Sequence, residues 1–507
     1  MAFEDERNII LKTVKNFKSF YQDHKIEIAI FTIFFLIDLI YLSNTTANVP
    51  IMDYWRFGNN FLYDMFNGGI QFDSFWESVN GQRGILTYLL FFINVHFFHW
   101  NTRIAIFFGA IVTFITGLYL LHCITDYSFA DPKKESFPTR CFFAIVMAMV
   151  LFNYVQWEIK VIEFSSPFSV NVLFVVFNMH AADRILLNLK KDNSNVIRFA
   201  FLLGISICFI FSAFFPAVVG AICICGAYNF FTNYKQDKLA YLKSYIIVGT
   251  SILIAALIYL YGAKGITSSD NNIYTFANYF LSGDFFTGMA AYLGSSIVHI
   301  SITEKYGVNF TICIGYIIAL LYGISIYFFF KDRRNKVKSY LPMMLILYTL
   351  LVGILLSYGR GNVFDTTYMC SSRYAYQSKL GLIGMLMILL NTVHYEKEKV
   401  ISWIKNAVKV ISISMIVCGL LYSQKTEYTI SPYRRILYED LIQNMYDIDN
   451  LADEELSAFQ SENPTYVRQT ILYMKMYRLG VFYNLPANGT FDQISETDLD
   501  ILIKYNN

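Results

Sequence analysis

Long apolar runs separated by short polar segments recur along the chain from about Ile26 to Tyr422. A helix needs about 20 mostly apolar residues to cross the hydrocarbon core of a bilayer, and these runs approach or reach that length. Eleven crossings are predicted, at residues 26–43, 103–124, 138–154, 167–187, 196–214, 216–231, 241–262, 308–330, 340–357, 373–393 and 402–422. The pattern therefore predicts an all-α, polytopic membrane protein.

Lysine and arginine residues gather in alternate loops, which the positive-inside rule assigns to the cytoplasm. The clusters lie at 184–198, 235–243, 331–338 and 397–405, with a weaker one at 133–140 that acidic residues offset. Eleven crossings with these loops inside predict a cytoplasmic N-terminus and an extracytoplasmic C-terminus.

One apolar run, residues 85–98, does not fit this alternation. It has about 14 residues, which is short for a hydrocarbon core of about 30 Å. If it crossed, the loop at 133–140 would move outside. We therefore interpret it as a helix lying in the outer interface of the membrane. The alternative is a twelfth crossing.

Three parts follow from this topology. Residues 1–25 are a polar, cytoplasmic N-terminal segment, and we expect no cleavable signal peptide. Residues 26–422 form the transmembrane module, with a large outer loop at 44–102. Residues 423–507 form an extracytoplasmic tail with amphipathic helices at 433–446 and 465–481. Asn463 and Pro464 are typical of a helix start, as cap and first helical residue.

Composition supports a membrane protein and excludes several function classes. The chain is 55% hydrophobic and 15% charged, whereas a soluble protein carries about 25% charged residues. Its glycines form no phosphate-binding loop, so no nucleotide fold and no nucleic-acid partner are expected. The eight cysteines lie mostly in or beside apolar runs, which argues against a disulfide framework.

The first outer loop carries the strongest candidate for chemistry. Asp53 lies a few residues after the first crossing, at the start of a predicted helix 53–66 that places Arg56 on the same face. A second interfacial helix is expected to open near Asn80–Arg83. Transfer of a group to a hydroxyl needs a carboxylate to accept the proton and a cation to hold a leaving phosphate. Asp53 as a helix cap and Arg83 as a residue reaching to lipid phosphates are the alternatives.

Two further outer loops carry charged candidates. Glu158 and Glu163 flank Lys160 in the second outer loop and offer a carboxylate for an acceptor or a divalent cation. Arg360 and Arg373 stand at the two ends of the loop 358–372. The positive-inside rule gives an outer loop no reason to hold arginines, so this pair is a candidate clamp for an anionic headgroup.

Other polar residues carry less weight. Asp38 lies within the first crossing, where an acid is costly and is a functional suspect, although it could also bond a neighbouring helix. His96 and His99 lack further ligands nearby, so no metal site is predicted.

The layout resembles the GT-C membrane glycosyltransferases, which use polyprenyl-phosphate-linked sugars. Asp53, the Asn80-Gly81-Gln82-Arg83 element, Gly359-Arg360 and Ser372-Arg373-Tyr374 are similar to short motifs of bacterial members that decorate cell-envelope polymers. One departure is that Gly81-Gln82 stands where the family usually has a Glu-His pair before the arginine.

The resemblance implies an inverting sugar transfer in a bacterial plasma membrane, from a polyprenyl-phosphate donor to a glycan acceptor. It implies Asp53 as the catalytic base and Glu158 as an aid to acceptor placement. The substrate-binding residues would be Arg56, Arg83, Glu158, Arg360, Arg373 and Tyr374. No cofactor is required, although a divalent cation stays open. A polysaccharide polymerase is the first alternative function, and a transporter of lipid-linked sugars is the second.

Overall fold

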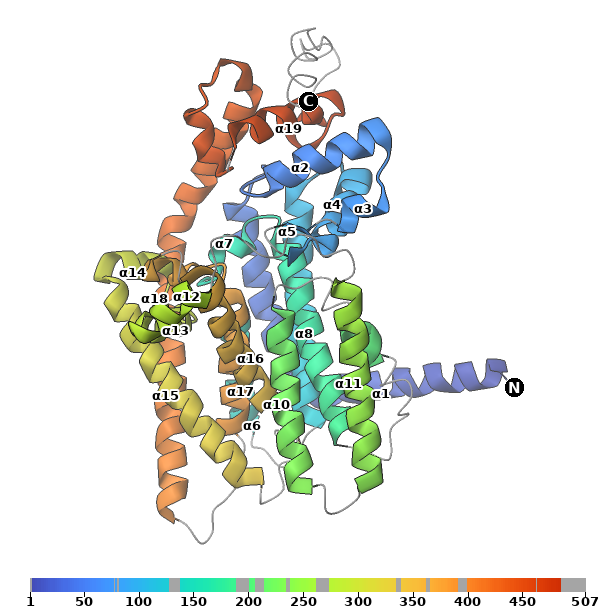
Figure 1. Cartoon of the computed structure of the whole chain (residues 1–507), viewed down its shortest axis with the longest axis vertical. Coiled ribbons are helices and arrows are strands. Elements are labelled where there is room, and N and C mark those ends of the chain that lie inside the picture. Colours follow the sequence, from blue (N-terminus) through green and yellow to red (C-terminus); the bar gives the residue numbers. More distant parts are fainter. Residues whose placement is uncertain are drawn as a thin grey trace.

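The computed structural model describes most of the chain as a bundle of helices running along the long axis of the molecule (Figure 1). The described residues are 2–484 without 77, 80–81, 127–136, 188–199, 206–213, 234–237, 261–272, 334–338, 362–364, 391–398 and 462. Within these ranges every element is helical except one short antiparallel pairing. That pairing joins β1 (Ser78–Val79) to β2 (Gln82–Arg83).

Among the described residues, six helices are long and apolar enough to cross a membrane. They are α1 (Ala2–Thr45), α5 (Thr102–Asp126), α10 (Phe215–Asn233), α15 (Val308–Arg333), α16 (Leu341–Leu356, continued by the π-helical turn η2, Ser357–Gly361) and α18 (Lys399–Tyr446). Four more helices of the bundle are α6 (Phe137–Leu151), α8 (Ser165–Leu186), α11 (Lys238–Leu260) and α17 (Ala375–Leu389). These ten helices coincide with ten of the predicted crossings. Most of the remaining predicted crossing, 196–214, lies outside the described residues. The part of it that is described at 200–205 is helical.

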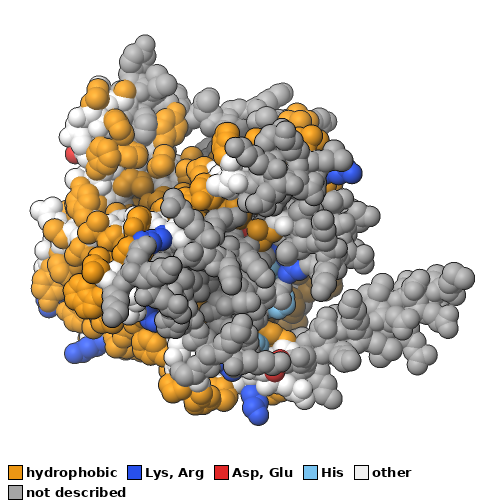
Figure 2. Space-filling view, turned by 90° about the horizontal axis from the view of Figure 1, so that it is seen from below, with side chains coloured by type: hydrophobic (Ala, Val, Ile, Leu, Met, Phe, Trp, Pro, Cys, Tyr) orange, Lys and Arg blue, Asp and Glu red, His pale blue; other side chains and the backbone are white. Residues whose placement is uncertain are grey.

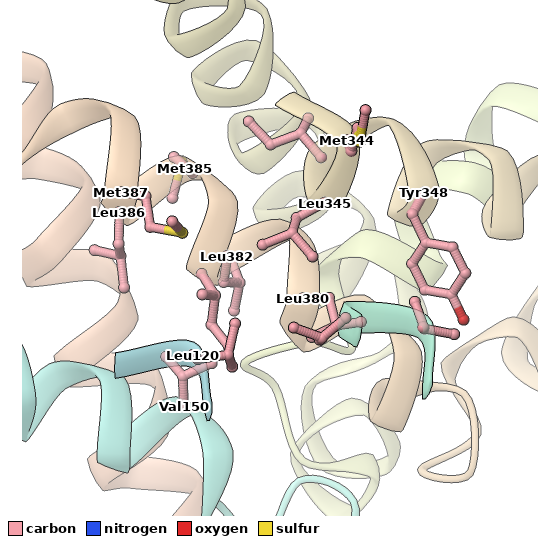
Figure 3. Close-up of a cluster of buried hydrophobic side chains, with 14 of the residues drawn as sticks. Leu120, Val150, Met344, Leu345, Tyr348, Leu380, Leu382, Met385, Leu386 and Met387 are labelled. Atoms are coloured by element: carbon pink, nitrogen blue, oxygen red, sulfur yellow. The ribbon is translucent and has the colours of Figure 1, made fainter. Parts of the chain in front are cut away.

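A continuous hydrophobic core holds the bundle together. Leu345 of α16 points toward Leu382 of α17 in this core (Figure 3). The two helices approach closely because Gly384 has no side chain, and a Cβ there would collide with the carbonyl oxygen of Pro342. A larger residue at this position would push α17 off α16, since packed interiors do not absorb even small volumes.

The first helix changes direction at His24, whose backbone is not helical (φ −123°). The segment before this kink points away from the bundle (Figure 1), as expected for a stretch lying along a membrane surface. The end of the bundle nearest this segment shows basic side chains at its surface (Figure 2).

The opposite end carries the short elements. They are α2 (Tyr54–Tyr63), η1 (Asp64–Gly68), α3 (Phe72–Trp76), α4 (Ile85–Phe98), α7 (Trp157–Lys160), α12 (Ile273–Leu281), α13 (Asp284–Gly294), α14 (Ile300–Tyr306) and η3 (Thr366–Cys370). The predicted helix 53–66 is confirmed by α2 and η1. A helix does open near Asn80–Arg83, because α4 starts at Ile85. The expectation that this helix carries Arg83 is wrong, because Arg83 lies on β2 and pairs with Ser78.

The tail continues directly from the bundle. The helix α18 has 48 residues and so extends about 72 Å, more than twice a hydrocarbon core. The predicted helix 433–446 is therefore the C-terminal end of α18. Beyond it come η4 (Ile448–Asn450), η5 (Glu455–Phe459), α19 (Pro464–Met476) and η6 (Gly480–Phe482). Asn463 caps α19, as predicted, by accepting from the Thr465 N–H at 2.9 Å.

A second hydrophobic core joins this tail to the first outer loop. It brings Trp55 and Phe61 of α2 together with Phe459 and Ile471 of the tail. Trp100, at the turn between α4 and α5, is fully buried in the same core. The described residues of the tail and of the loop 44–102 thus form one packed unit at the end of the bundle opposite the N-terminal segment, next to Asp53.

Candidate functional site

Asp53 lies directly before the first residue of α2, at the end of the bundle opposite the N-terminal segment. Its side chain is 35% exposed, and Arg56 lies one helical turn away with a nitrogen–oxygen distance of 3.8 Å. That distance is too long for a hydrogen bond. No hydrogen bond reaches the Asp53 carboxylate from the residues that the structure describes. Its oxygens are therefore open to a ligand.

Glu158 has the opposite environment, although it is also a carboxylate at this end of the bundle. It is buried, and its Oε1 lies 3.0 Å from a guanidinium nitrogen of Arg373. Its Oε2 accepts from the Ser372 hydroxyl at 2.7 Å and from the Ser371 hydroxyl at 3.4 Å. The Arg373 Nε also donates to the Ser371 hydroxyl at 3.0 Å. Glu158 is thus fully occupied in fixing Arg373.

Arg373 links the two carboxylates. It precedes α17, and its side chain is 38% exposed above the Tyr368 ring. Burial works against its charged form, but Glu158, Tyr368, Tyr374 and Asp53 outweigh burial and raise the pKa of Arg373. Asp53 is therefore close enough to Arg373 for their charges to interact. The first and fourth outer loops meet here, although 320 residues separate them in sequence.

Tyr374 and Arg360 complete the same region. Tyr374 is buried, and this burial, together with Tyr368, raises the pKa of its hydroxyl, while Arg373 and Arg360 act in the opposite direction. Arg360 belongs to the π-helical turn at the end of α16. The structure thus brings together Asp53, Arg56, Glu158, Arg360, Arg373 and Tyr374, all of them predicted from the sequence. Only the backbone of Arg83 is described, so its predicted contact with a substrate lies outside the described side chains.

A buried ionic cluster lies deeper between the helices. Asp38 of α1 pairs with Lys160 of α7, and Lys379 of α17 donates to the Gln156 side chain at 3.1 Å. Asp38 also interacts electrostatically with Lys379. All four residues are at least 97% buried. Of the two interpretations of Asp38, the structure supports a bond to a neighbouring element, and Lys160 is that partner.

A third polar network anchors α18. Glu427 accepts two hydrogen bonds from Arg434, at 2.8 and 2.9 Å. It also accepts from the Tyr41 hydroxyl at 2.6 Å and lies 3.0 Å from the His299 ring. The Arg434 guanidinium stacks on the ring of Trp157, 3.2 Å from the ring centre. Trp157 directly precedes Glu158 in the chain.

Sequence reasoning missed Lys379 and Arg434. Lys379 could have been found, because a lysine inside a predicted crossing is as unusual as Asp38. Arg434 could not have been found, because its stacking contact is with Trp157, which is far away in sequence. The histidines His96 and His99 stack on Phe92 and Tyr483. Within the described residues, no three potential metal ligands gather.

The charges at this end can hold an anion. Two carboxylates, those of Asp53 and Glu158, lie among three guanidinium groups, those of Arg56, Arg360 and Arg373. An excess of cations near an open carboxylate is suited to a reaction that releases a phosphate and a proton.

The sequence matches no model of a known protein family, and no curated protein is significantly similar to it.

Proposed function

We propose that this chain is an inverting glycosyltransferase that moves a sugar from a polyprenyl-phosphate carrier to a hydroxyl of a glycan acceptor. The reaction takes place at the outer end of the bundle. The proposal is supported by the partly exposed carboxylate of Asp53, which lies within electrostatic reach of the Arg373 guanidinium that Glu158 holds. Such a pair lets one group accept a proton while the other stabilises a leaving phosphate.

The two carboxylates have different roles in this proposal. The acceptor oxygen forms a bond to the anomeric carbon of the sugar, and Asp53 takes the proton from that oxygen. Glu158 is unsuited to this step because Arg373, Ser371 and Ser372 already occupy its oxygens. Its role is to orient Arg373 rather than to bind the acceptor.

The phosphate leaves as the bond between the anomeric carbon and the phosphate oxygen breaks. Its oxygens then carry the electron pair, and Arg373 and Arg360 supply the compensating charge, with Tyr374 beside them and Arg56 beside Asp53. Exposed apolar side chains precede Arg360 in the chain, since Ile354 and Tyr358 near the end of α16 are 39% and 42% exposed. A lipid tail can lie against these side chains while its phosphate meets the arginines.

The test is sugar transfer by the purified protein with a panel of polyprenyl-phosphate sugars and a glycan acceptor. Asp53→Asn should lower kcat by about 10²–10⁴-fold, the usual contribution of a general base, while donor binding is retained. Asp284→Asn is the matched control, because Asp284 is exposed and bonds only locally to Ser282 in the described structure.

Two results would contradict the proposal. Full transfer by Asp53→Asn would exclude Asp53 as the base. Absence of sugar transfer from every donor would favour a polymerase, which joins preassembled units, or a transporter. Those two are then distinguished by whether lipid-linked sugar changes leaflet in vesicles that contain the protein.

A further inference from the structure

The backbone next to Asp53 has an unfavourable conformation. Met52 has φ +62°, in the left-handed region that residues with a side chain seldom adopt. Such a conformation persists only where its surroundings impose it, and it is often found at functional sites. The constraint here comes from the tail, because the Met52 N–H donates to the carbonyl of Phe459 at 3.2 Å.

A second tail contact holds the first turn of α2. The hydroxyl of Thr470, a buried residue of α19, donates to the carbonyl of Trp55 at 2.8 Å. The Trp55 ring meets the Phe459 ring edge to face, with centroids 5.1 Å apart. Asp53 therefore lies between two backbone groups, at Met52 and at Trp55, that the tail holds in place.

The fit between α2 and α19 depends on a glycine. A Cβ at Gly58 would lie 2.6 Å from the Trp100 ring and 2.7 Å from a Thr470 methyl carbon. No ordinary side chain fits there without separating the two helices. This close approach is what lets Thr470 reach the backbone of α2.

The side-chain contacts of Asp53 do not fix its position by themselves. Arg56 is its ion-pair partner among the described residues, at 3.8 Å. The direction of the carboxylate is thus set mainly by the backbone that carries it. Misplacement of a reacting group by about 1 Å can cost about a hundredfold in rate.

We infer that the tail segment 456–482, through Thr470 and the Phe459 carbonyl, is a positioning element that aims the Asp53 carboxylate at Arg373. The inference rests on the proposed function for its catalytic meaning. Its structural content, the placement of the side chain at position 53, can be measured separately. Thr470 is a positioning residue, since it acts through the backbone of α2.

The activity test uses Thr470→Val, which removes the hydroxyl and keeps the shape. We expect kcat to fall about tenfold, with the KM for the donor unchanged, because Arg360 and Arg373 are not disturbed. Thr470→Ser should restore kcat because it keeps the donor. The control is Thr429→Val, since the exposed Thr429 bonds only within its own helix. Loss of folded protein with unchanged kcat per folded molecule would show a merely structural role and overturn the inference.

The second test needs no sugar donor. The thiol introduced by Asp53→Cys is alkylated with a water-soluble reagent over a range of pH and quantified in its own peptide by mass spectrometry. Nearby Arg56 and Arg373 should lower its pKa. Adding Thr470→Val should move the alkylation midpoint toward that of a free cysteine, whereas adding Thr429→Val should not.

The two tests separate the two claims. A shifted midpoint supports the positioning role even if no sugar transfer is found, in which case the proposed function fails alone. An unchanged midpoint overturns the positioning role even if the wild-type protein transfers sugar.

Discussion

Asp38→Asn should destabilise the folded bundle more than Lys160→Met, although the two residues form one ion pair. In the buried cluster, Asp38 interacts with both Lys160 and Lys379. Removing Asp38 leaves two buried ammonium groups without a carboxylate among the described residues. Removing Lys160 leaves Asp38 and Lys379, whose charges still balance.

The expected magnitudes follow from this asymmetry. An uncompensated buried charge costs about 3–5 kcal/mol of folding free energy, which is the loss expected for Asp38→Asn. For Lys160→Met we expect about 1–3 kcal/mol, the cost of leaving a buried polar group without its hydrogen bond. The double variant should lose less than the sum, because removal of one cation relieves the repulsion that Asp38→Asn creates.

The assay is thermal unfolding of the purified variants in one detergent, followed by tryptophan fluorescence. The melting temperatures should rank wild type first, then Lys160→Met, then Asp38→Asn. Phe152→Leu is a suitable control for packing, since the Phe152 ring lies 5.8 Å from the Lys160 ammonium and carries no charge. Equal losses in the two single variants, or a greater loss in Lys160→Met, would refute the charge argument.

Three further predictions concern other parts of the molecule. Arg434→Lys should lower stability by about 1–3 kcal/mol in the same assay, because lysine cannot make both the paired bonds to Glu427 and the stacking contact; unchanged melting would contradict this. Burial raises the pKa of Glu163 well above its usual value of about 4.5. The neutral carboxyl group therefore contributes fully to folding stability below the unfolded-state pKa. As pH rises from there toward the folded-state pKa, this contribution is lost by about 1.4 kcal/mol per pH unit. Glu163→Gln should therefore flatten the fall of melting temperature with pH, and an unchanged slope would argue against a neutral Glu163. For topology, a cysteine at position 90 should react with an impermeant reagent from outside and one at position 130 should not; external labelling at position 130 would overturn the eleven-crossing count.

Helix positions could be predicted well from the sequence because a bilayer imposes a simple rule. Backbone polar groups in hydrocarbon must be satisfied within the segment, so a long apolar run has to be helical. The crossing predicted to start at residue 216 agrees with α10, which begins at Phe215. The prediction failed at Arg83, which lies on β2 instead of on the expected helix. Outside the bilayer no comparable rule applies, and local pairing decided the structure.

Part of the candidate site was also readable. Unexpected charges outside the bundle pointed to Asp53, Glu158, Arg360 and Arg373, because charge placement in membrane proteins follows from the cost of transferring charge. The different environments of these carboxylates, and therefore their different proposed roles, could not be predicted from the sequence. Only the contacts show that Glu158 is occupied by Arg373 while Asp53 is open.

By itself, then, the sequence determined the class of protein, the position of most helices and the outer-loop charges, since each follows from local composition and the energetics of a bilayer. The tertiary structure decided which charges meet, and it joined the tail to the loop that carries Asp53. Thr470 and Trp55 are 415 residues apart, and their hydrogen bond depends on Gly58 allowing α19 to approach α2. Contacts of this kind arise from packing between distant segments, which no local pattern encodes.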